Sequence, residues 1–442
     1  MPDGEVIRDT IAAVATPAGR GGIGIVRVSG PGVPQIAARV ITRPPEAGKA
    51  VLRPFRDARG DAVDEGIALY FRAPHSYTGE DVLELQGHGG PVVTQAVLGA
   101  VLDAGARLAE PGEFTRRAFL NGKIDLAQAE AVADLIDAAS REAARSALRS
   151  LSGEFSSAIA DLVAGLTELR ALTEAMLDFP DDEVDSLHRG EAAERLGKLR
   201  AALEEVIIKS GQGSLLRNGI HAVIAGCPNV GKSSLLNRLA GEERAIVTAT
   251  PGTTRDALRE SIQIEGVPVV VVDTAGLRAS GDEIERLGMK RTHEEMARAD
   301  VVLVVLEAGK REAPDEDLPA AGARITVLNK IDLVAGSVAG EHGDEIHVSA
   351  KTGAGLDALR TALLRAAGWN SRGESVFLAR ARHLRALKTA QAHFAAAVEQ
   401  GANWEFFAEE LRLAQAALGG ITGQVSADDL LGEIFSRFCI GK

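Results

Sequence analysis

The sequence predicts a multidomain α/β protein. A mixed α/β domain at the N-terminus is followed by a discontinuous all-α domain, into which an α/β domain with a mainly parallel sheet is inserted. Three patterns indicate this order: short apolar runs with turns, then apolar residues spaced by three and four, then strands alternating with helical stretches. The chain has 442 residues, more than one hydrophobic core usually supports.

Composition excludes several classes of protein. Hydrophobic residues make up 45% and charged residues 25% of the chain, as in ordinary globular domains, so general disorder is excluded. The formal net charge is −13, so any contact with nucleic acid needs a local basic face. The sequence has no apolar run long enough to span a membrane, no signal peptide pattern and only two cysteines, so we expect a cytoplasmic protein without membrane contact.

The first domain is expected over residues 1–120. Ile23–Val28 and Val82–Leu85 have the short apolar pattern of strands, and glycine and proline mark the turns. This pattern predicts a small mixed α/β domain.

The second domain is expected to be helical and to occupy residues 121–213 and 372–442. Apolar residues over 148–176 are spaced as on one face of a single long amphipathic helix, which should stop before Pro180. A further helix is expected to run to about residue 210. The two helical segments are expected to pack together, because the α/β domain is inserted between them.

The inserted domain is expected over residues 214–371. Its apolar strands are predicted at His221–Ala225, Val269–Val272, Val301–Leu306 and Ile325–Leu328. Strands that alternate with helical stretches are typical of a parallel sheet with crossover helices.

The strongest motif is Gly-Cys-Pro-Asn-Val-Gly-Lys-Ser, from Gly226 to Ser233, between a predicted strand and a predicted helix. In this context it is a P-loop. Its backbone amides and the helix N-terminus attract phosphates, Lys232 neutralises phosphate charge, and the Ser233 hydroxyl binds Mg²⁺.

Further motifs follow the later strands in order. Asp273-Thr-Ala-Gly276 brings a carboxylate to the magnesium shell and a glycine amide to the γ-phosphate. In Asn329-Lys-Ile-Asp332, the Asp332 carboxylate can accept both guanine N1–H and N2–H, whereas adenine would leave it unpaired. The inserted domain is therefore predicted to be a Ras-like P-loop GTPase domain that binds GTP and Mg²⁺. The expected nucleotide contacts are Asn229, Val230, Gly231, Lys232, Ser233, Ser234, Thr248, Ala249, Thr250, Pro251, Gly252, Thr253, Thr254, Asp273, Thr274, Ala275, Gly276, Asn329, Lys330, Asp332, Ser349, Ala350 and Lys351.

Two positions depart from Ras-type GTPases. Leu277 stands where those enzymes carry a glutamine that orients the attacking water, so another group must orient it. Asn229 and the loop 248–254 offer amide, carbonyl and hydroxyl oxygens beside the phosphates, so we expect a monovalent cation in place of an arginine finger. Thr254 is the expected second magnesium hydroxyl.

Motifs along the whole chain resemble a known family. The P-loop, Pro-Gly-Thr-Thr-Arg-Asp, Asp-Thr-Ala-Gly-Leu-Arg and Asn-Lys-x-Asp are similar to the potassium-dependent GTPases of the TrmE-Era-EngA type. The segment that starts at Ala15, the segments Tyr77–Gly90 and Glu113–Asn121, and the terminal Cys439-Ile-Gly-Lys442 narrow the resemblance to the tRNA modification GTPases called MnmE or TrmE.

The resemblance implies a reaction. Members of that family form a heterotetramer with MnmG, an FAD protein, and place a carboxymethylaminomethyl-type group on carbon 5 of the wobble uridine of tRNA. A tetrahydrofolate derivative, 5-formyl- or methylenetetrahydrofolate, donates the one-carbon unit. The N-terminal domain is expected to form a homodimer and bind the folate, and K⁺ is expected to activate hydrolysis by G-domain dimerisation.

The resemblance also implies site residues. Glu285 would orient the attacking water through a bridging water, although the sequence pattern alone does not separate it from Asp282 and Glu283. The K⁺ ligands would be Asn229, Thr248, Thr250 and Thr253. The folate contacts would be Arg27, Glu84, Lys123 and Lys442, of which Arg27 and Lys123 taken alone would be interpreted as solvated surface charges.

Both cysteines and one histidine need separate interpretation. Cys439 is either a thiolate nucleophile toward uracil or, as we favour, a residue that only lines the site, because no histidine base is near in sequence. Cys227 is expected to pack or to lie at the surface. His88 is expected to be a turn or core histidine without an assigned role.

Two other classes of GTPase are alternatives. A ribosome-assembly switch of the Era or Der type would show a KH-type module or a second P-loop, and a membrane-remodelling GTPase would need a lipid-binding tip. The sequence has none of these features. Its N-terminal 120 residues and the Cys-Ile-Gly-Lys tail favour the tRNA-modifying enzyme.

Overall fold

The protein is described from a computed structural model, which describes residues 9–178, 185–241, 259–273, 299–310, 322–370, 376–400, 403–424, 428–436 and 438–441. The chain divides into two compact units. Unit 1 comprises residues 1–133 and 419–442, and unit 2 comprises residues 134–418. Both units combine helices with a sheet, which confirms the predicted multidomain α/β class.

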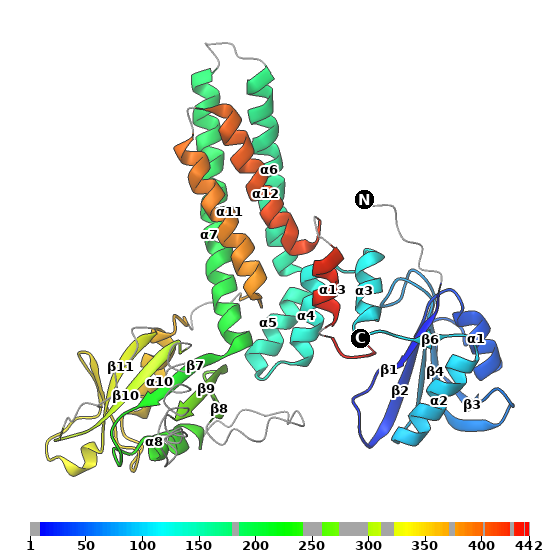
Figure 1. Cartoon of the computed structure of the whole chain (residues 1–442), viewed down its shortest axis with the longest axis horizontal. Helices are drawn as coiled ribbons and strands as arrows, with labels where there is room; N and C mark the ends of the chain where they lie inside the picture. The colour runs from blue at the N-terminus through cyan, green and yellow to red at the C-terminus, as the bar shows by residue number, and fades with distance from the viewer. Residues whose placement is uncertain are drawn as a thin grey trace, which may run out of the picture. The chain divides into compact units, whose positions relative to one another are not determined.

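A mixed sheet forms the centre of unit 1. Its strands are β1 (Ile11–Val14), β2 (Gly21–Ser29), β3 (Val51–Arg56), β4 (Ala62–Phe71), β5 (Val82–Gly89) and β6 (Arg107–Leu108). They lie in the order β3-β4-β5-β2-β1-β6, and only β1 and β6 are parallel neighbours (Figure 1). The two predicted strands of this domain lie within β2 and β5.

Helices cover part of this sheet. The helices of unit 1 are α1 (Val33–Val40), α2 (Pro91–Asp103), α3 (Glu113–Leu120), α4 (Leu126–Ile136), which crosses into unit 2, and α13 (Asp428–Ser436). Buried side chains of α1 and α2 share one core with those of β2 and β5. Near the C-terminus, Phe435 and Phe438 pack in a second cluster with Leu126 of α4 and Phe119 of α3. The C-terminal helix is therefore part of the N-terminal unit.

The sheet of unit 2 has a parallel centre. Its strands are β7 (Ile220–Ala225), β8 (Arg259–Ile264), β9 (Val267–Asp273), β10 (Val301–Glu307), β11 (Ala323–Asn329), β12 (Gly340–His342) and β13 (Glu345–His347). The order is β12-β13-β11-β10-β7-β9-β8, with antiparallel partners only at the two edges. This sheet confirms the predicted strands and their parallel arrangement.

The helices of unit 2 form two groups. Near the sheet are α8 (Lys232–Ala240), α10 (Leu356–Ala366) and the 3-10 helix η2 (Ile331–Leu333), and α8 and α10 share a core with the strands. The other helices are α5 (Arg141–Leu151), α6 (Glu154–Asp178), α7 (Asp185–Asn218), α11 (Ala381–Glu399) and α12 (Trp404–Thr422), which crosses into unit 1 at Gly419. In Figure 1, α6, α7, α11 and α12 run side by side, and Arg170 of α6 donates a hydrogen bond of 2.8 Å to Gln415 of α12.

Two helix predictions were wrong. The single helix expected over residues 148–176 is two helices, because Gly153 between α5 and α6 has φ +94°, which a right-handed helix does not accommodate. The helix expected to end near residue 210 continues to Asn218. Gly213 does not end it; a β-carbon there would overlap the carbonyl oxygen of Phe377, so this glycine permits a close approach.

The helices of the described residues are too short or too polar to span a lipid bilayer.

Candidate functional site

The P-loop joins β7 to α8 in unit 2. Gly231 precedes α8 with φ +93°, and at the other end of the loop a β-carbon on Gly226 would overlap the carbonyl oxygen of Val305. Lys232 is 6% exposed, and its ammonium donates hydrogen bonds to the carbonyl oxygens of Gly226 (2.6 Å) and Cys227 (2.9 Å). A cation and a helix N-terminus therefore lie in one tight loop, an arrangement that binds phosphate.

The predicted base-selecting residues lie beside this loop. Asn329, which ends β11, is 1% exposed, and its amide nitrogen donates to the Val230 carbonyl oxygen at 2.9 Å. Its side-chain oxygen accepts from the Ala350 amide at 3.0 Å, and Asp332 accepts from the Ser349 hydroxyl at 2.6 Å. The structure thus brings the P-loop, the Asn-Lys-x-Asp segment and the Ser-Ala-Lys segment together at one end of the parallel sheet.

Lys330 links the two loops directly. It has φ +66°, and its ammonium donates to the Asn229 carbonyl oxygen (2.6 Å) and to Glu307 (2.8 Å). Hydrogen bonds from Lys330 and then Lys310 hold the pKa of Glu307 below its usual value. Sequence reasoning missed Glu307, although its position at the end of an apolar strand was a usable signal.

Only some of the remaining predicted site residues lie in the described part of the chain. Among those described, Val230 is buried, while Ser233, Ser234 and Lys351 are exposed. Asp273 ends β9, but its side chain lies outside the described residues. The predicted residues that lie wholly outside them are Thr248, Ala249, Thr250, Pro251, Gly252, Thr253, Thr254, Thr274, Ala275, Gly276, Glu285 and Lys442.

A second polar site lies in unit 1. Arg27 on β2 is the direct sheet neighbour of Glu84 on β5, and its Nε and Nη2 both lie 3.0 Å from Glu84 Oε1. The guanidinium carbon lies 5.5 Å from the ring centroid of Tyr77 and 5.7 Å from that of Phe114. The Arg27 side chain is only 20% exposed, so the interpretation as a solvated surface charge was wrong for this residue.

Tyr77 and Phe114 were not singled out from the sequence. The Tyr77 hydroxyl lies 2.8 Å from the Thr115 hydroxyl, and burial raises the pKa of Tyr77. Both aromatic residues fall inside segments that carry the family resemblance, which was the available signal. An ion pair flanked by two aromatic rings suits a planar ligand whose edge carries hydrogen-bond donors and acceptors.

Lys123 and the C-terminal tail also belong to unit 1. The Lys123 ammonium is exposed and donates to the Pro74 carbonyl oxygen at 3.0 Å. The Gly112 amide donates to the Cys439 carbonyl oxygen at 3.4 Å, and Ile440 forms an antiparallel bridge with Pro111. Cys439 is exposed. The tail is therefore seated at the N-terminal end of α3.

His88 differs from the expectation. It is neither a turn nor a core residue, because it lies on β5 with its side chain 74% exposed and its Nδ1 2.7 Å from Asp64 Oδ1. Burial alone would raise the pKa of Asp64, but hydrogen bonds from the His88 side chain and amide lower it overall. By contrast, Cys227 packs partly buried against the core of unit 2.

Known protein families match both units of the chain. Residues 10–123 match the family described as GTP-binding protein TrmE N-terminus, and residues 126–439 match the MnmE helical domain. The tRNA modification GTPase MnmE of Azoarcus sp. (strain BH72) is 59% identical over 449 residues, which cover 98% of each chain. The proteins of the same name from Thiobacillus denitrificans and Aromatoleum aromaticum are 59% and 57% identical, again over 98% of each chain.

Proposed function

The chain belongs to the MnmE family of tRNA modification GTPases, and we propose that it places a carboxymethylaminomethyl-type group on carbon 5 of the wobble uridine of tRNA. It is a GTP-hydrolysing enzyme of tRNA modification. In the proposal, the chain forms a heterotetramer with an MnmG-like FAD protein, and a folate donates the one-carbon unit. The reaction is proposed to take place in the cytoplasm. The full-length match disfavours the alternative, a ribosome-assembly switch of the Era or Der type.

The observation that carries the folate proposal is the Arg27–Glu84 pair beside Tyr77 and Phe114. Glu84 Oε1 accepts from Arg27, while Oε2 receives only a long hydrogen bond of 3.3 Å from Gln86 among the described residues. Oε2 therefore retains capacity to accept the N–H groups of a pterin. In the same proposal, Lys123 and Lys442 attract the carboxylates of the folate tail.

The nucleotide site fits GTP with its ions. Lys232 is buried at the N-terminus of α8, where a cation and a helix end favour phosphate, and the Asn229 carbonyl oxygen, which accepts from Lys330, lies in the same loop. Ser233, Thr254 and Asp273 are the proposed holders of Mg²⁺, and Asn229, Thr248, Thr250 and Thr253 are those of K⁺. When bound, the ions neutralise charge on the phosphates, and Glu285 is proposed to orient the attacking water.

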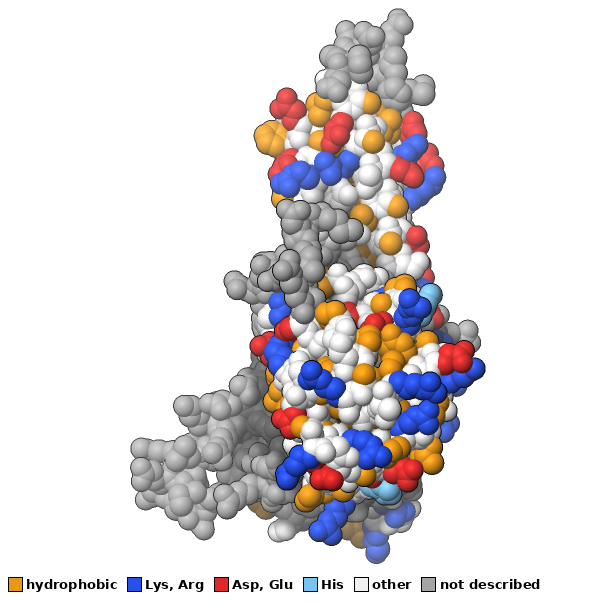
Figure 2. All heavy atoms as spheres, turned by 90° about the vertical axis from the view of Figure 1, so that its right-hand side faces the viewer, with side chains coloured by type: hydrophobic (Ala, Val, Ile, Leu, Met, Phe, Trp, Pro, Cys, Tyr) orange, Lys and Arg blue, Asp and Glu red, His pale blue; other side chains and the backbone are white. Residues whose placement is uncertain are grey.

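A homodimer through unit 1 is part of the proposal. Leu52 on β3 and Ile67 on β4 are register partners and are 62% and 41% exposed. In the view of Figure 2, exposed hydrophobic side chains lie among Lys and Arg on the described surface. Apolar side chains exposed side by side on a sheet face favour burial against another protein surface.

Cys439 is proposed to line the folate and uridine site. Its thiol is exposed and its carbonyl is held by Gly112. A nucleophilic role would require a neighbouring base to activate the thiol.

Two measurements on the purified protein test the proposal. GTP turnover should be much faster in potassium than in sodium at equal ionic strength, and equal rates would remove the cation from the mechanism. Calorimetric titration with 5-formyltetrahydrofolate should show binding that Glu84→Gln weakens about tenfold, because a charged acceptor is lost. Glu65→Gln, an exposed glutamate on β4, is the matched control. Absence of binding to the unaltered protein would refute the folate donor.

A further inference from the structure

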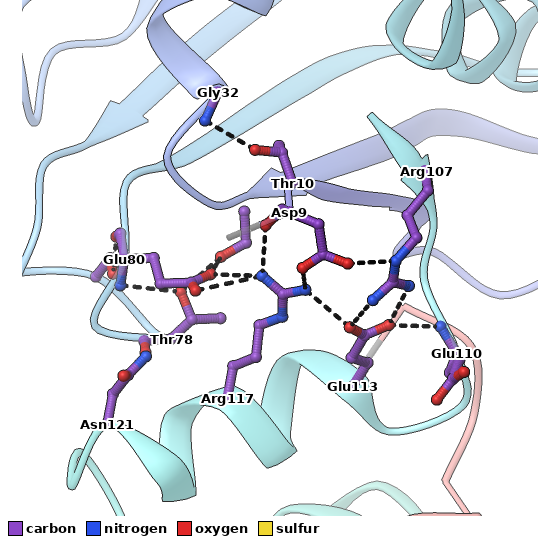
Figure 3. Close-up of polar contacts among 12 residues, drawn as sticks. Asp9, Thr10, Gly32, Thr78, Glu80, Arg107, Glu110, Glu113, Arg117 and Asn121 are labelled. Atoms are coloured by element: carbon purple, nitrogen blue, oxygen red, sulfur yellow. Dashed lines mark hydrogen bonds and ion pairs between the residues drawn. The ribbon is translucent and has the colours of Figure 1, made fainter. Parts of the chain in front are cut away.

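Arg117 on α3 is almost completely buried, at 1% exposure. Figure 3 shows its guanidinium between carboxylates from three segments of the chain. Nη2 donates to Glu113 and to Asp9, both at 2.8 Å. Nη1 donates to both carboxylate oxygens of Glu80 at 3.2 Å and to the Asp9 carbonyl oxygen at 3.0 Å.

Glu80 extends this network to the segment that carries Tyr77. Its Oε2 accepts from the Ser29 hydroxyl at 2.7 Å, and the Ser29 hydroxyl lies 2.7 Å from that of Thr78. Thr78 is fully buried, and the Asn121 side chain donates to its carbonyl oxygen at 2.8 Å. Segment 77–80 is therefore held from β2 on one side and from the α3 end on the other (Figure 3).

Both ends of the network reach the ligand site. Ser29 lies two residues after Arg27 on β2, and Thr78 directly follows Tyr77. Since the ring of Tyr77 lies over the Arg27 guanidinium, any displacement of Thr78 moves one wall of the site.

We propose that Arg117 is a positioning residue for the ligand site of unit 1: it anchors segment 77–80 so that the Tyr77 ring stays over the Arg27–Glu84 pair. The functional part of this inference rests on the proposed folate site. We assign Arg117 a positioning role rather than a ligand contact, because it is 1% exposed and its guanidinium donates to Asp9, Glu80 and Glu113.

The arrangement of the carboxylates around position 117 requires an arginine, and another cationic side chain would not suffice. Two nitrogens of one planar group bind carboxylates on different segments at the same time, and a lysine ammonium is a single point charge. Arg117→Lys keeps the charge and removes the fork. It therefore separates positioning from charge neutralisation.

The test uses two readouts on the full-length chain. The sequence contains only two tyrosines, Tyr70 and Tyr77, so protein labelled with 3-fluorotyrosine gives two fluorine NMR signals. In Arg117→Lys the Tyr77 signal should shift or broaden, and the dissociation constant for 5-formyltetrahydrofolate should rise about tenfold or more. Arg116→Lys, an exposed neighbour on the same helix, should change neither. Turnover of GTP should stay unchanged, since that site lies in unit 2.

A second variant keeps the test valid if Arg117→Lys does not fold. Asn121→Ala removes only the hydrogen bond to the Thr78 carbonyl from an exposed side chain, and it should produce the same changes to a smaller extent. Wild-type values in both readouts for both variants would overturn the proposal. If the unaltered protein binds no folate, the folate proposal fails, while the Tyr77 signal still decides whether Arg117 positions that segment.

Discussion

Gly441 passes so close to Val14 that a β-carbon at Gly441 would overlap the Val14 carbonyl oxygen. Gly441 also has φ +99°, which side-chain-bearing residues rarely adopt. Gly441 therefore lies against the end of β1, while Phe435 of α13 and Phe438, which follows that helix, pack in the cluster with Leu126. The fold places Cys439 in unit 1, although it is 438 residues away from the first residue in sequence.

Gly441→Ala should release this tail. We expect binding of 5-formyltetrahydrofolate to weaken by about tenfold and Cys439 to react faster with a thiol reagent. The reason is that a side chain at position 441 would overlap the Val14 carbonyl oxygen and strain the backbone, so the tail would leave its native position. Calorimetry and thiol titration measure the two effects. Gly432→Ala is the control, since that glycine lies on α13 with open space around it. Equal behaviour of the two variants would show that the tail is not seated as described.

Asp332→Asn should change the base that the enzyme accepts. Asparagine keeps an oxygen for the Ser349 hydroxyl, now 2.6 Å from Asp332, but it replaces one acceptor by a donor. GTP should bind about a hundredfold less tightly, whereas xanthosine triphosphate, which has a carbonyl at carbon 2, should bind more tightly. Hydrolysis rates with both nucleotides measure this exchange. Asp344→Asn, in an exposed turn, should leave the preference for GTP intact.

Glu113 should make unit 1 sensitive to acid. Burial alone would raise its pKa, but hydrogen bonds from Arg107, the Glu110 amide and Arg117 hold it below the ordinary value of 4.5. A lowered folded-state pKa stabilises the protein fully above pH 4.5, and this contribution is lost as the pH falls through the folded value. Thermal unfolding between about pH 7 and pH 3 should show the loss.

Glu113→Gln should reduce the slope of that acid loss and lower stability at neutral pH, because Arg107 and Arg117 each lose a charged partner. Glu110→Gln replaces an exposed glutamate nearby and should retain the original slope. An unchanged slope in Glu113→Gln would assign the acid sensitivity to other carboxylates.

Asp134 should stabilise unit 2, because it binds one arginine just before the inserted domain and another just after it. Its carboxylate is 2.8 Å from Arg217 Nε, just before β7, and 2.9 Å from Arg380 Nη2, at the start of α11. Asp134→Asn should cost about 2 kcal/mol in the free energy of unfolding, because a buried charge partner of two arginines is removed. Denaturant unfolding measures the loss. The exposed Asp137→Asn should cost less than about 0.5 kcal/mol, and a similar cost in both would refute this role.

Local patterns were enough to predict much of the fold. The central strands β9 and β10 of unit 2 are valine-rich runs, and the P-loop and Asn-Lys-x-Asp segments are short contiguous motifs, so the sequence identifies them directly. Glycines were less informative. Gly153 ends a helix through its positive φ, while Gly213 sits within a helix where Phe377 approaches, and the sequence around them does not distinguish these two uses.

The residues around the proposed ligand site of unit 1 are brought together by contacts between segments that are distant in sequence. Arg117 meets Asp9 and Glu80, which are 108 and 37 residues away in sequence, so no local pattern predicts their contact. The Arg27–Glu84 pairing likewise depends on sheet register across 57 residues. Family resemblance supplied the residues that are proposed to contact folate, whereas the contacts around Arg27 and Glu84 are seen only in the structure.

The most direct test of the account is reconstitution of the modification. Purified protein, an MnmG-like flavoprotein, unmodified tRNA, GTP, Mg²⁺, K⁺, methylenetetrahydrofolate as the one-carbon donor and glycine as the amino donor are incubated, and the wobble nucleoside is analysed by mass spectrometry. We predict a uridine substituted at carbon 5 that disappears when GTP or folate is omitted, or when Lys232→Ala replaces the native chain. Modification that continues without GTP, or without folate, would contradict the central claim that this chain couples GTP hydrolysis to folate-dependent tRNA modification.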